Sequence, residues 1–391
     1  MFGLLARFLK TSAKAEPGTA AGQVDASGPE SWKAKGNGLF VAGRMEEALA
    51  CYRKALEIDP DYGDARWNAA LAALFLGDYT AGFSYYESRF HAGPAAHRQH
   101  LQDVTAMMAG KRFWRGEALR GERLLVWTEQ GFGDSLMFMR FLPQLRERGR
   151  CRLLVACEQE MVRVMERMPG VDEVISKDLA LSPDCFDLHC SLLSLPHLLG
   201  LAPAALSAAR YMTVPEDMAR HWAARLAGLP NPKVGVAWAG GAQLPEDSVR
   251  SLALKEFRPL AETSGVTFVS LQKGAPAAQL AELDWPIVDW MGECRDFLDT
   301  AALVQGLDLV VSADTAVAHL AGALGKPVWL LNRHESEWRW MLGREDSLWY
   351  PTMRIFRQPA PRDWAAVMLR VAEELRKLAA AWSRSGRSQP L

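Results

Sequence analysis

The sequence predicts an α/β protein in which two Rossmann-like domains follow a small all-α module. Three observations predict this architecture: a helical repeat with a period of 34 residues, an alternation of short apolar runs with helical stretches from about residue 120, and a restart of that alternation at Lys233. With 391 residues the chain is too long for one ordinary core, and its length suits two α/β domains with an extra module.

The first 30 residues are expected to form a disordered lead-in. Residues 11–30 lack periodic apolar positions, and the apolar start of the chain is interrupted by Arg7 and lacks the long core of a signal peptide. No segment reaches the ~18 uncharged apolar residues that are needed to span a bilayer. These features favour a cytoplasmic protein with no integral membrane segment.

The charge balance and the cysteines exclude several classes of protein. There are 45 basic and 46 acidic residues, so the formal charge of −1 supplies no net attraction for nucleic acid or an anionic membrane. A bound anion must therefore be held by local groups. The six cysteines show no C-x-x-C pair and no histidine cluster with zinc-site spacing, which indicates reduced thiols and no metal site.

The helical repeat starts at about residue 31. Equivalent residues 34 positions apart are Gly43 and Gly77, Ala48 and Gly82, Tyr52 and Tyr86, and Pro60 and Pro94. This period is typical of tetratricopeptide repeats, in which each unit is a pair of helices. We expect Tyr52 and Tyr86 to pack between the helices of their pairs, and Pro60 and Pro94 to close the second helix of each pair. The tetratricopeptide module is predicted to span residues 31–115.

The first Rossmann-like domain is predicted for residues 116–212. Apolar and β-branched runs predict four strands, at Arg123–Trp127, Arg152–Ala156, Glu173–Ile175 and Phe186–His189. Between the first two strands, the spacing of apolar residues predicts an amphipathic helix over Ser135–Glu147.

The second Rossmann-like domain is predicted for residues 213–360, and residues 361–391 are expected to hold a terminal helix and a tail. Five apolar runs predict the strands, at Lys233–Trp238, Val266–Leu271, Pro286–Asp289, Leu307–Ser312 and Pro327–Leu331. A short helix of small residues is expected at Ala316–Leu324, and the terminal helix at Arg362–Trp382. Ligands of open α/β sheets bind beyond the carboxyl ends of the strands, which predicts a site in a cleft between the domains.

The first candidate site is the loop after the first strand, Thr128–Asp134. Gly131 and Gly133 let the chain turn sharply out of the strand into a helix, with Gln130 beside them and Asp134 at the helix start. Aspartate is also a favoured helix cap, so a purely capping role for Asp134 is an equally good interpretation of this turn.

The second candidate site runs from Ser312 into the next helix. Asp314, Thr315 and Ala316 stand where the free N–H groups of the helix start can seat a diphosphate. His319 follows Thr315 by four residues and so shares its face of the helix. The alternative makes Asp314 the helix cap and His319 a satisfied core histidine.

A third group of polar residues follows two further strand ends. Gly240 lies in a glycine turn, Arg250 follows in a polar loop, and Gln272 and Lys273 come just after the next strand. A guanidinium group suits a donor phosphate, but solvated loop arginines are as common.

Aromatic residues are concentrated after the last predicted strand. Trp338, Trp340, Trp349 and Tyr350 can stack on a sugar or a base, or lock the C-terminal helix across the two domains. We favour the structural role.

From about residue 120 to 380 the chain resembles glycosyltransferase family nine, the heptosyltransferase family, and in particular its bacterial members with tetratricopeptide repeats. The resemblance rests on Glu129–Asp134, on the long segment Ser312–Pro327, and on the motifs between Trp338 and Pro351. It implies the GT-B fold of two Rossmann-like domains and transfer of a sugar from a nucleotide-sugar donor, which is a substrate and not a cofactor.

The resemblance also implies roles for individual residues. Asp134 corresponds to the proposed general base, and Asp314, Thr315 and His319 correspond to the segment that binds the donor sugar and diphosphate. Catalysis would be a direct displacement with inversion, in which backbone dipoles and a cation stabilise the leaving nucleoside diphosphate and no metal is required.

Three departures from the family pattern separate this chain from the lipopolysaccharide enzymes. Ala316 stands where a glycine is usual, Arg250 replaces a lysine, and the interval from Asp134 to Pro143 is longer. The appended helical repeats are similar to those of protein glycosyltransferases, including flagellin-modifying enzymes and O-linked N-acetylglucosamine transferases. The acceptor is therefore expected to be a protein or a cell-surface glycan.

Two other classes of function remain compatible with the sequence. A non-catalytic interaction protein would use the repeats to bind partners and keep a degenerate GT-B body as a scaffold. A sugar-nucleotide epimerase on the same fold would act on a donor without an acceptor. Retention of Asp134, Thr315 and His319 favours the transferase, whereas Ala316 and Arg250 favour the scaffold.

Overall fold

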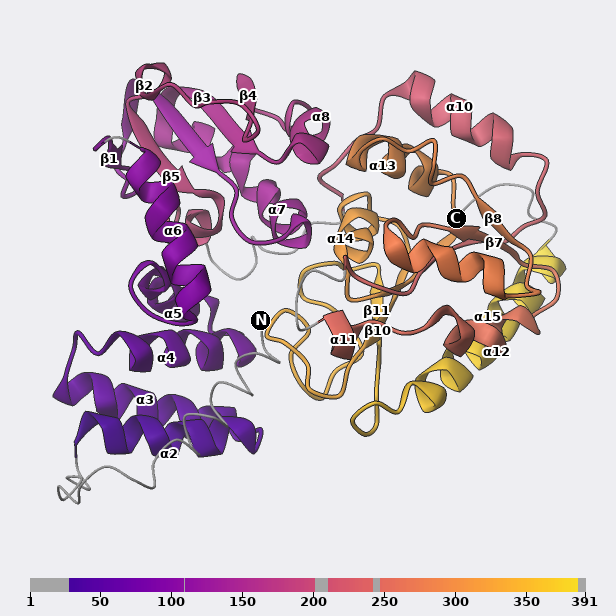
Figure 1. Ribbon diagram of the computed structural model, residues 1–391, viewed down its shortest axis with the longest axis horizontal. Coiled ribbons are helices and arrows are strands. Elements are labelled where there is room, and N and C mark those ends of the chain that lie inside the picture. The colour runs from indigo at the N-terminus through magenta and orange to yellow at the C-terminus, as the bar shows by residue number, and fades with distance from the viewer. Residues whose placement is uncertain (1–27, 109, 201–209, 242–246, 386–391) are drawn as a thin grey trace. The chain divides into compact units, whose positions relative to one another are not determined.

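The computed structural model describes residues 28–108, 110–200, 210–241 and 247–385 (Figure 1). The lead-in expected for residues 1–30 lies almost wholly outside them. The chain divides into two compact units. Unit 1 holds the residues up to Gly116 with Ser194–Leu206 and Ser336–Gly343, and unit 2 holds the rest. The domain bounds given above divide the chain differently, and they stay predictions.

Unit 1 begins with two helix pairs. The helices are α2 (Pro29–Val41), α3 (Met45–Ile58), α4 (Gly63–Phe75) and α5 (Tyr79–Tyr86). Tyr52 of α3 packs against Gly36 of α2 so closely that a Cβ on Gly36 would lie 2.5 Å from its ring. In the second pair, Tyr86 stacks on Trp67 with ring centroids 5.3 Å apart. The packing predicted for the two tyrosines is confirmed.

The end of the second repeat differs from the prediction. After α5, a 3-10 turn (Glu87–Phe90) follows, and Pro94 is the N-cap of α6 (Ala95–Met107). Pro94 therefore begins a helix and does not close one, because a residue without an N–H group is best tolerated where the helix leaves its first donors unbonded.

The aromatic segment around Trp338 also belongs to unit 1. Trp338 packs edge-on against Phe83 of α5, with ring centroids 6.0 Å apart, and Met341 lies beside Gly77. The expectation that this segment locks the C-terminal helix is wrong for Trp338, which packs on a repeat helix. A contact between residues 255 positions apart leaves no periodic trace in the sequence.

Replacing Gly36 with alanine is expected to lower the stability of unit 1 by about 1–3 kcal/mol, because the added Cβ meets the Tyr52 ring. Gly38→Ala is the matched control: it lies in the same helix, and nothing approaches its added Cβ within 4 Å. At that open position alanine is expected to stabilise by up to about 1 kcal/mol. Circular-dichroism melting of both variants measures the difference, and equal midpoints would contradict the close packing.

The first sheet of unit 2 is parallel. Its strands are β2 (Leu119–Trp127), β3 (Gly149–Cys157), β4 (Glu173–Ser176) and β5 (Leu188–Ser191). Within this unit their order is β5-β2-β3-β4. Strands β3 and β4 follow one another on one side of β2, and β5 pairs with β2 on its other side. The short helix α8 (Val162–Met165) lies between β3 and β4 along the chain.

The second sheet is also parallel. Its strands are β6 (Lys233–Ala237), β7 (Thr267–Ser270), β8 (Ile287–Asp289), β9 (Leu309–Ala313), β10 (Val328–Asn332) and β11 (Met353–Arg357). They follow the order β11-β10-β9-β6-β7-β8. The direction of winding reverses between β6 and β9. Parallel strands with helices on both faces define the predicted α/β class.

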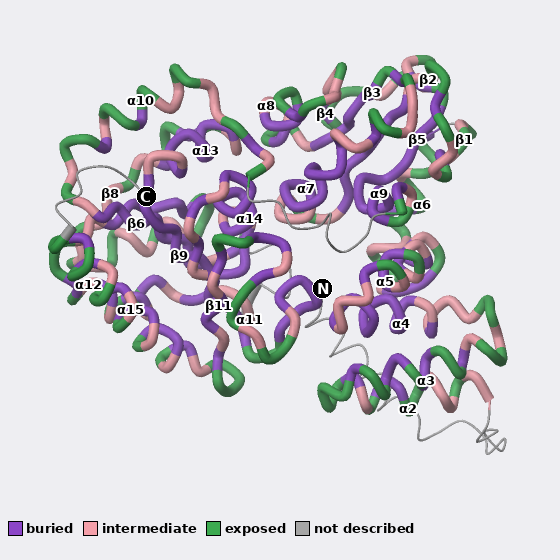
Figure 2. Tube along the Cα trace, turned by 180° about the vertical axis from the view of Figure 1, so that it is seen from behind, coloured by how far each residue is buried: buried purple, intermediate pink, exposed green. Residues whose placement is uncertain are grey.

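Helices cover both faces of the second sheet (Figures 1 and 2). On one face lie α10 (Glu216–Leu226), α13 (Phe297–Gln305) and α14 (Ala316–Ala323). On the other lie α12 (Arg258–Ala261) and α15 (Trp364–Ser385), whose apolar side chains pack with Val234, Val236 and Val311 of the strands. The central strands β6 and β9 are buried, whereas the edge strand β8 and the outer faces of the helices are more exposed, as Figure 2 shows.

Several elements of unit 2 differ from their predictions. The helix expected over Ser135–Glu147 is α-helical only in α7 (Phe132–Phe138) and continues as a 3-10 helix (Met139–Arg148), with Pro143 inside it. Proline cannot donate the hydrogen bond that an α-helix needs there. Strand β11 is not predicted from the sequence, because Arg354 and Arg357 interrupt its apolar run. Strands β2 and β3 begin four and three residues before their predicted starts. The other strands of this unit fall within about two residues of their predicted bounds, the usual uncertainty of element ends.

Candidate active site

The predicted loops follow strands at the reversal points of the two sheets. In the first sheet the reversal lies between β2 and β5, and the loop of Gln130 and Gly131 follows β2. In the second sheet it lies between β6 and β9, where Ala237 pairs with Ser312. Gly240 and Asp314 follow these two strands. Such reversal points are where open α/β sheets bind their ligands.

Helices α7 and α14 bring two predicted residues together. Gly133 of α7 lies against His319 of α14, and a Cβ on Gly133 would come 2.8 Å from Cδ2 of the imidazole. The neighbouring Phe132 packs on Phe297 of α13, with ring centroids 4.9 Å apart. The two helices lie side by side in Figure 1. Residues 186 positions apart thus meet, and no side chain larger than hydrogen fits at Gly133.

Asp134 is the third residue of α7. Its Oδ2 accepts a hydrogen bond from the N–H of Gly131 at 3.1 Å, so its carboxylate contributes to capping the helix. The N-cap residue itself is Gly131, whereas the alternative interpretation expected Asp134 in that position. Gln130, just before this turn, has a φ of 64°, a strained backbone conformation for a residue with a side chain. A carboxylate has two oxygens and several acceptor positions, so capping and a role as base are compatible.

The start of α14 is ordered by hydroxyl groups. Thr315 is its N-cap, and its hydroxyl is 3.1 Å from the hydroxyl of Ser312. The cap is therefore Thr315, and the interpretation that assigned it to Asp314 is wrong. Asp314 and Thr315 are both buried, whereas Ala316, the first helical residue, is partly exposed. The first N–H groups of a helix favour an anion at this position.

His319 is buried and held by Tyr350. Its Nδ1 lies 2.8 Å from the Tyr350 hydroxyl, and Tyr350 is itself fully buried. Burial raises the pKa of Tyr350 well above its usual value, so the phenol stays neutral and can donate its proton to Nδ1. In that arrangement Nε2, on the side of Gly133, carries the ring proton. His319 can then donate a hydrogen bond toward the start of α7.

Arg140 is a buried residue that the sequence analysis missed. Its guanidinium donates to the carbonyls of Met137 and Trp349, each at 2.8 Å, and to the Tyr211 hydroxyl at 2.9 Å. It also lies over the rings of Tyr211 and Tyr350, 4.4 and 4.8 Å from their centroids. A lone arginine in the apolar run from Leu136 to Leu142 was the available signal, because a charge there must find internal partners.

The third predicted group has partners in the protein itself. Oε1 of Gln272 accepts from the N–H groups of Trp238 and Ala239 at 3.0 and 2.9 Å, and its Nε2 donates to two carbonyls. It therefore braces the loop after β6. In the same loop the N–H of Gly240 donates to Ser251 at 3.0 Å.

Lys273 and Arg250 complete the third predicted group. Lys273 is exposed and donates to the carbonyl of Cys294, and Arg250 is the last residue of the short α11 (Asp247–Arg250). Their roles in donor binding stay predictions.

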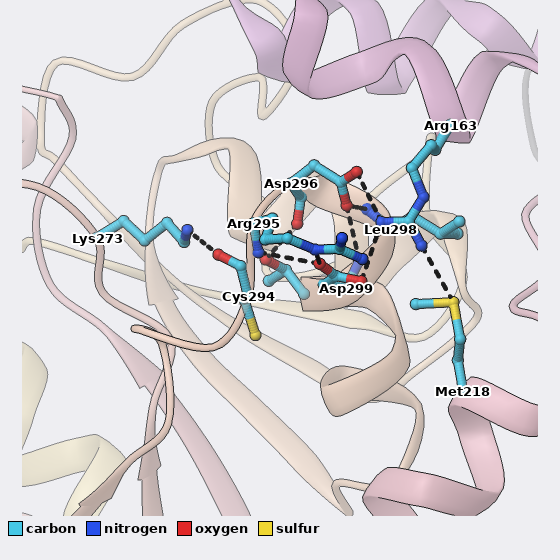
Figure 3. A network of polar contacts seen from close by, with 9 residues as sticks. Arg163, Met218, Lys273, Cys294, Arg295, Asp296, Leu298 and Asp299 are labelled. Atoms are coloured by element: carbon cyan, nitrogen blue, oxygen red, sulfur yellow. Dashed lines mark hydrogen bonds and ion pairs between the residues drawn. The ribbon is translucent and has the colours of Figure 1, made fainter.

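Unit 2 contains two α/β halves, one around each sheet. An arginine of the first half forms hydrogen bonds to aspartates of the second half (Figure 3). Arg163 of α8 donates to Asp296 at 2.9 Å and to Asp299 at 3.0 Å, both at the start of α13. Burial opposes the charge of Asp299, but hydrogen bonds from Arg295 and Arg163 lower its pKa below the usual value. Asp296 caps α13 through the N–H groups of Leu298 and Asp299. These contacts position α13, which also carries Phe297 against α7.

The described residues lack two kinds of feature. They contain no group of three or more His, Cys, Asp or Glu side chains that could hold a metal ion. Within the same part of the chain, no helix is both long and apolar enough to cross a membrane.

Sequence families match both parts of the chain. Residues 29–62 match the tetratricopeptide repeat, and residues 275–342 match glycosyltransferase family 9 (heptosyltransferase). The chain therefore carries a tetratricopeptide-repeat segment among its first helices and a segment similar to glycosyltransferase family 9 that includes β8, β9 and β10 of the second sheet.

A curated relative matches most of the chain. The chain is 32% identical over 382 residues to Protein FlbA of Caulobacter vibrioides, an alignment that covers 90% of this chain. It spans 63% of the length of that relative.

Two solved structures are similar at lower identity. ADP-heptose lipopolysaccharide heptosyltransferase II of E. coli is 17% identical, with 67% of this chain and 99% of that chain covered and a TM-score of 0.49. A family 9 glycosyltransferase of Veillonella parvula is 12% identical, with 68% and 98% covered and the same TM-score, 0.49.

Proposed function

We propose that this chain is a glycosyltransferase that moves a sugar from a nucleotide-sugar donor to a hydroxyl group of a protein or a cell-surface glycan. The observation that supports this most is the contact between α7 and α14, which joins the Gly133–Asp134 turn to His319. Candidate acceptor and donor residues then stand beside each other, as a direct displacement requires.

The donor is proposed to bind at the start of α14. Its diphosphate accepts hydrogen bonds from the first N–H groups of the helix and from Thr315, where the helix dipole favours negative charge. His319, with its proton on Nε2, donates to the donor or to the acceptor between the two helices. These groups stabilise the charge that develops on the leaving nucleoside diphosphate.

Asp134 is proposed to accept the proton of the acceptor hydroxyl. As that proton moves to the carboxylate, the acceptor oxygen bonds to the anomeric carbon, and the bond from this carbon to the diphosphate breaks on the opposite side. The reaction inverts the anomeric configuration and uses no metal. The N–H of Gly131 holds the carboxylate in place through its 3.1 Å hydrogen bond.

A protein acceptor is favoured by the helical repeats of unit 1. Tetratricopeptide arrays present extended surfaces that bind polypeptides. All six cysteines are free thiols, which supports a reducing compartment such as the cytoplasm.

The test is a thermal-shift screen of the full chain against nucleotides and nucleotide sugars, each with and without EDTA. A ligand at one hundred times its dissociation constant adds about 2.7 kcal/mol of stability, so a donor is expected to raise the melting temperature clearly. EDTA is expected to leave the shift unchanged. No shift with any nucleotide sugar would reject the transferase and favour the scaffold protein.

A further inference from the structure

Arg333 and Gln358 lie next to each other at the carboxyl edge of the second sheet. Arg333 follows β10 and Gln358 follows β11, in strands that pair Asn332 with Arg357. The N–H of Gln358 donates to the carbonyl of Asn332 at 2.9 Å, so the hydrogen bonding between β10 and β11 extends to Arg333 and Gln358. Neither residue was singled out by the sequence.

Both side chains are buried and keep unused donors. Arg333 is 6% exposed, and its Nε and Nη1 have no hydrogen-bond partner among the residues that the structure describes. Gln358 is 3% exposed; its Oε1 accepts from the N–H of His334 at 3.0 Å, whereas its Nε2 has no partner in the described chain. Arginine and an amide nitrogen can only donate, so they cannot satisfy each other. The missing group is an acceptor.

The chemistry of this acceptor follows from its surroundings. A guanidinium group matches the oxygens of a phosphate or carboxylate with two parallel hydrogen bonds. Arg357, the last residue of β11, directly precedes Gln358, and burial lowers its pKa to about 10, so it stays charged at neutral pH. Buried polar donors without partners are rare in proteins and indicate a ligand or ordered water.

The edge adjoins the start of α14. Strand β10 pairs with β9, with Leu331 opposite Ala313, so Arg333 lies one strand away from the Asp314–Thr315 turn. Neighbouring strands are about 4.8 Å apart. An anion with two linked phosphoryl groups can therefore reach from the helix start to Arg333.

We propose that Arg333 and Gln358 bind the donor's diphosphate and complete the seat that begins at the α14 N-terminus. The proposal rests on the proposed function, since it names residues for the same donor. One phosphoryl group accepts from the first N–H groups of α14, and the other accepts from Arg333 and Gln358. Arg333 then contributes affinity for the diphosphate, whereas other residues recognise the base of the nucleotide.

The test is calorimetric titration of wild type, Arg333→Met and Gln358→Leu with UDP, ADP, GDP and inorganic pyrophosphate. Loss of a hydrogen bond to a charged group predicts that Arg333→Met weakens nucleoside diphosphate and pyrophosphate by about tenfold to hundredfold. Gln358→Leu is expected to weaken both less. Arg220→Gln removes the same charge from an exposed position of α10 and is expected to change neither.

Thermal melting separates a ligand contact from a structural role. Without ligand, Arg333→Met is expected to melt at or above the wild-type temperature, because it removes a buried cation that lacks a partner. A lower melting temperature with unchanged diphosphate affinity would make Arg333 structural and overturn the proposal.

The remaining outcomes are also distinct. If Arg333→Met loses only pyrophosphate and keeps full affinity for the nucleoside diphosphates, the residue binds a free anion and the proposal fails. If wild type binds a nucleotide and Arg333→Met binds it equally, the proposed function stands and the inference fails. If wild type binds none of the nucleotides or nucleotide sugars, both fall.

Discussion

Replacing Asp134 with asparagine is expected to lower the rate of sugar transfer by about 10²–10⁴-fold, the usual contribution of a positioned general base. Donor affinity is expected to stay near that of wild type, because the donor site is proposed at the start of α14 and not at Asp134. Asparagine keeps a side-chain oxygen that can accept from the N–H of Gly131, so the helix cap survives. Only the proton acceptor is lost.

Two further variants make this result specific. Asp134→Ala removes both the cap and the base, and it is expected to lose about 1 kcal/mol of stability as well as activity. Asp178→Asn makes the same chemical change at an exposed position of the same α/β half and is expected to transfer normally. Initial rates with the donor found by screening measure transfer, and calorimetry measures donor affinity. Equal turnover in Asp134→Asn would leave Asp134 only its capping role.

Replacing Arg140 with alanine is expected to destabilise unit 2 by about 3–5 kcal/mol. The change leaves a cavity and takes the donor away from the carbonyls of Met137 and Trp349 and the hydroxyl of Tyr211. For a unit of this size the melting temperature is expected to fall by about 10 °C. Nucleotide affinity is expected to fall too, because Tyr350, which holds His319, packs on the guanidinium.

Calorimetric melting checks this expectation, with two comparisons. Arg140→Lys keeps the charge but not the planar fork, and is expected to recover only part of the lost stability. Arg150→Ala removes an arginine from an exposed position of β3, and no change beyond about 0.5 kcal/mol is expected. An Arg140→Ala protein that melts with wild type would show that solvent or neighbouring groups replace all three hydrogen bonds.

Local sequence patterns predict much of the fold. The 34-residue period placed Tyr52 and Tyr86 correctly, because each repeat is a local unit whose packing recurs along the chain. Buried parallel strands such as β3 and β9 were recognised from their continuous apolar runs. Strand β11 was missed for the converse reason, since its arginines break the run.

The candidate loops were found in the same local way. Glycine turns and short polar segments at strand ends predicted the loops of Asp134 and Thr315, and the reversal points of both sheets lie at these loops. The chemical role of each side chain could not be predicted from spacing. Gln272 is an example, because it bonds to the backbone of a neighbouring loop that only the pairing of β6 with β7 brings near.

The sequence by itself determined the α/β class, the helical repeats and the strand-end loops, because these depend on residues close together along the chain. The tertiary structure alone decided which distant groups meet: Gly133 with His319, Arg140 with Trp349 and Tyr211, and Arg333 beside Gln358. The physical reason is burial. Polar groups removed from water must find partners wherever the packing of the sheets and helices places them, and sequence distance does not constrain that choice.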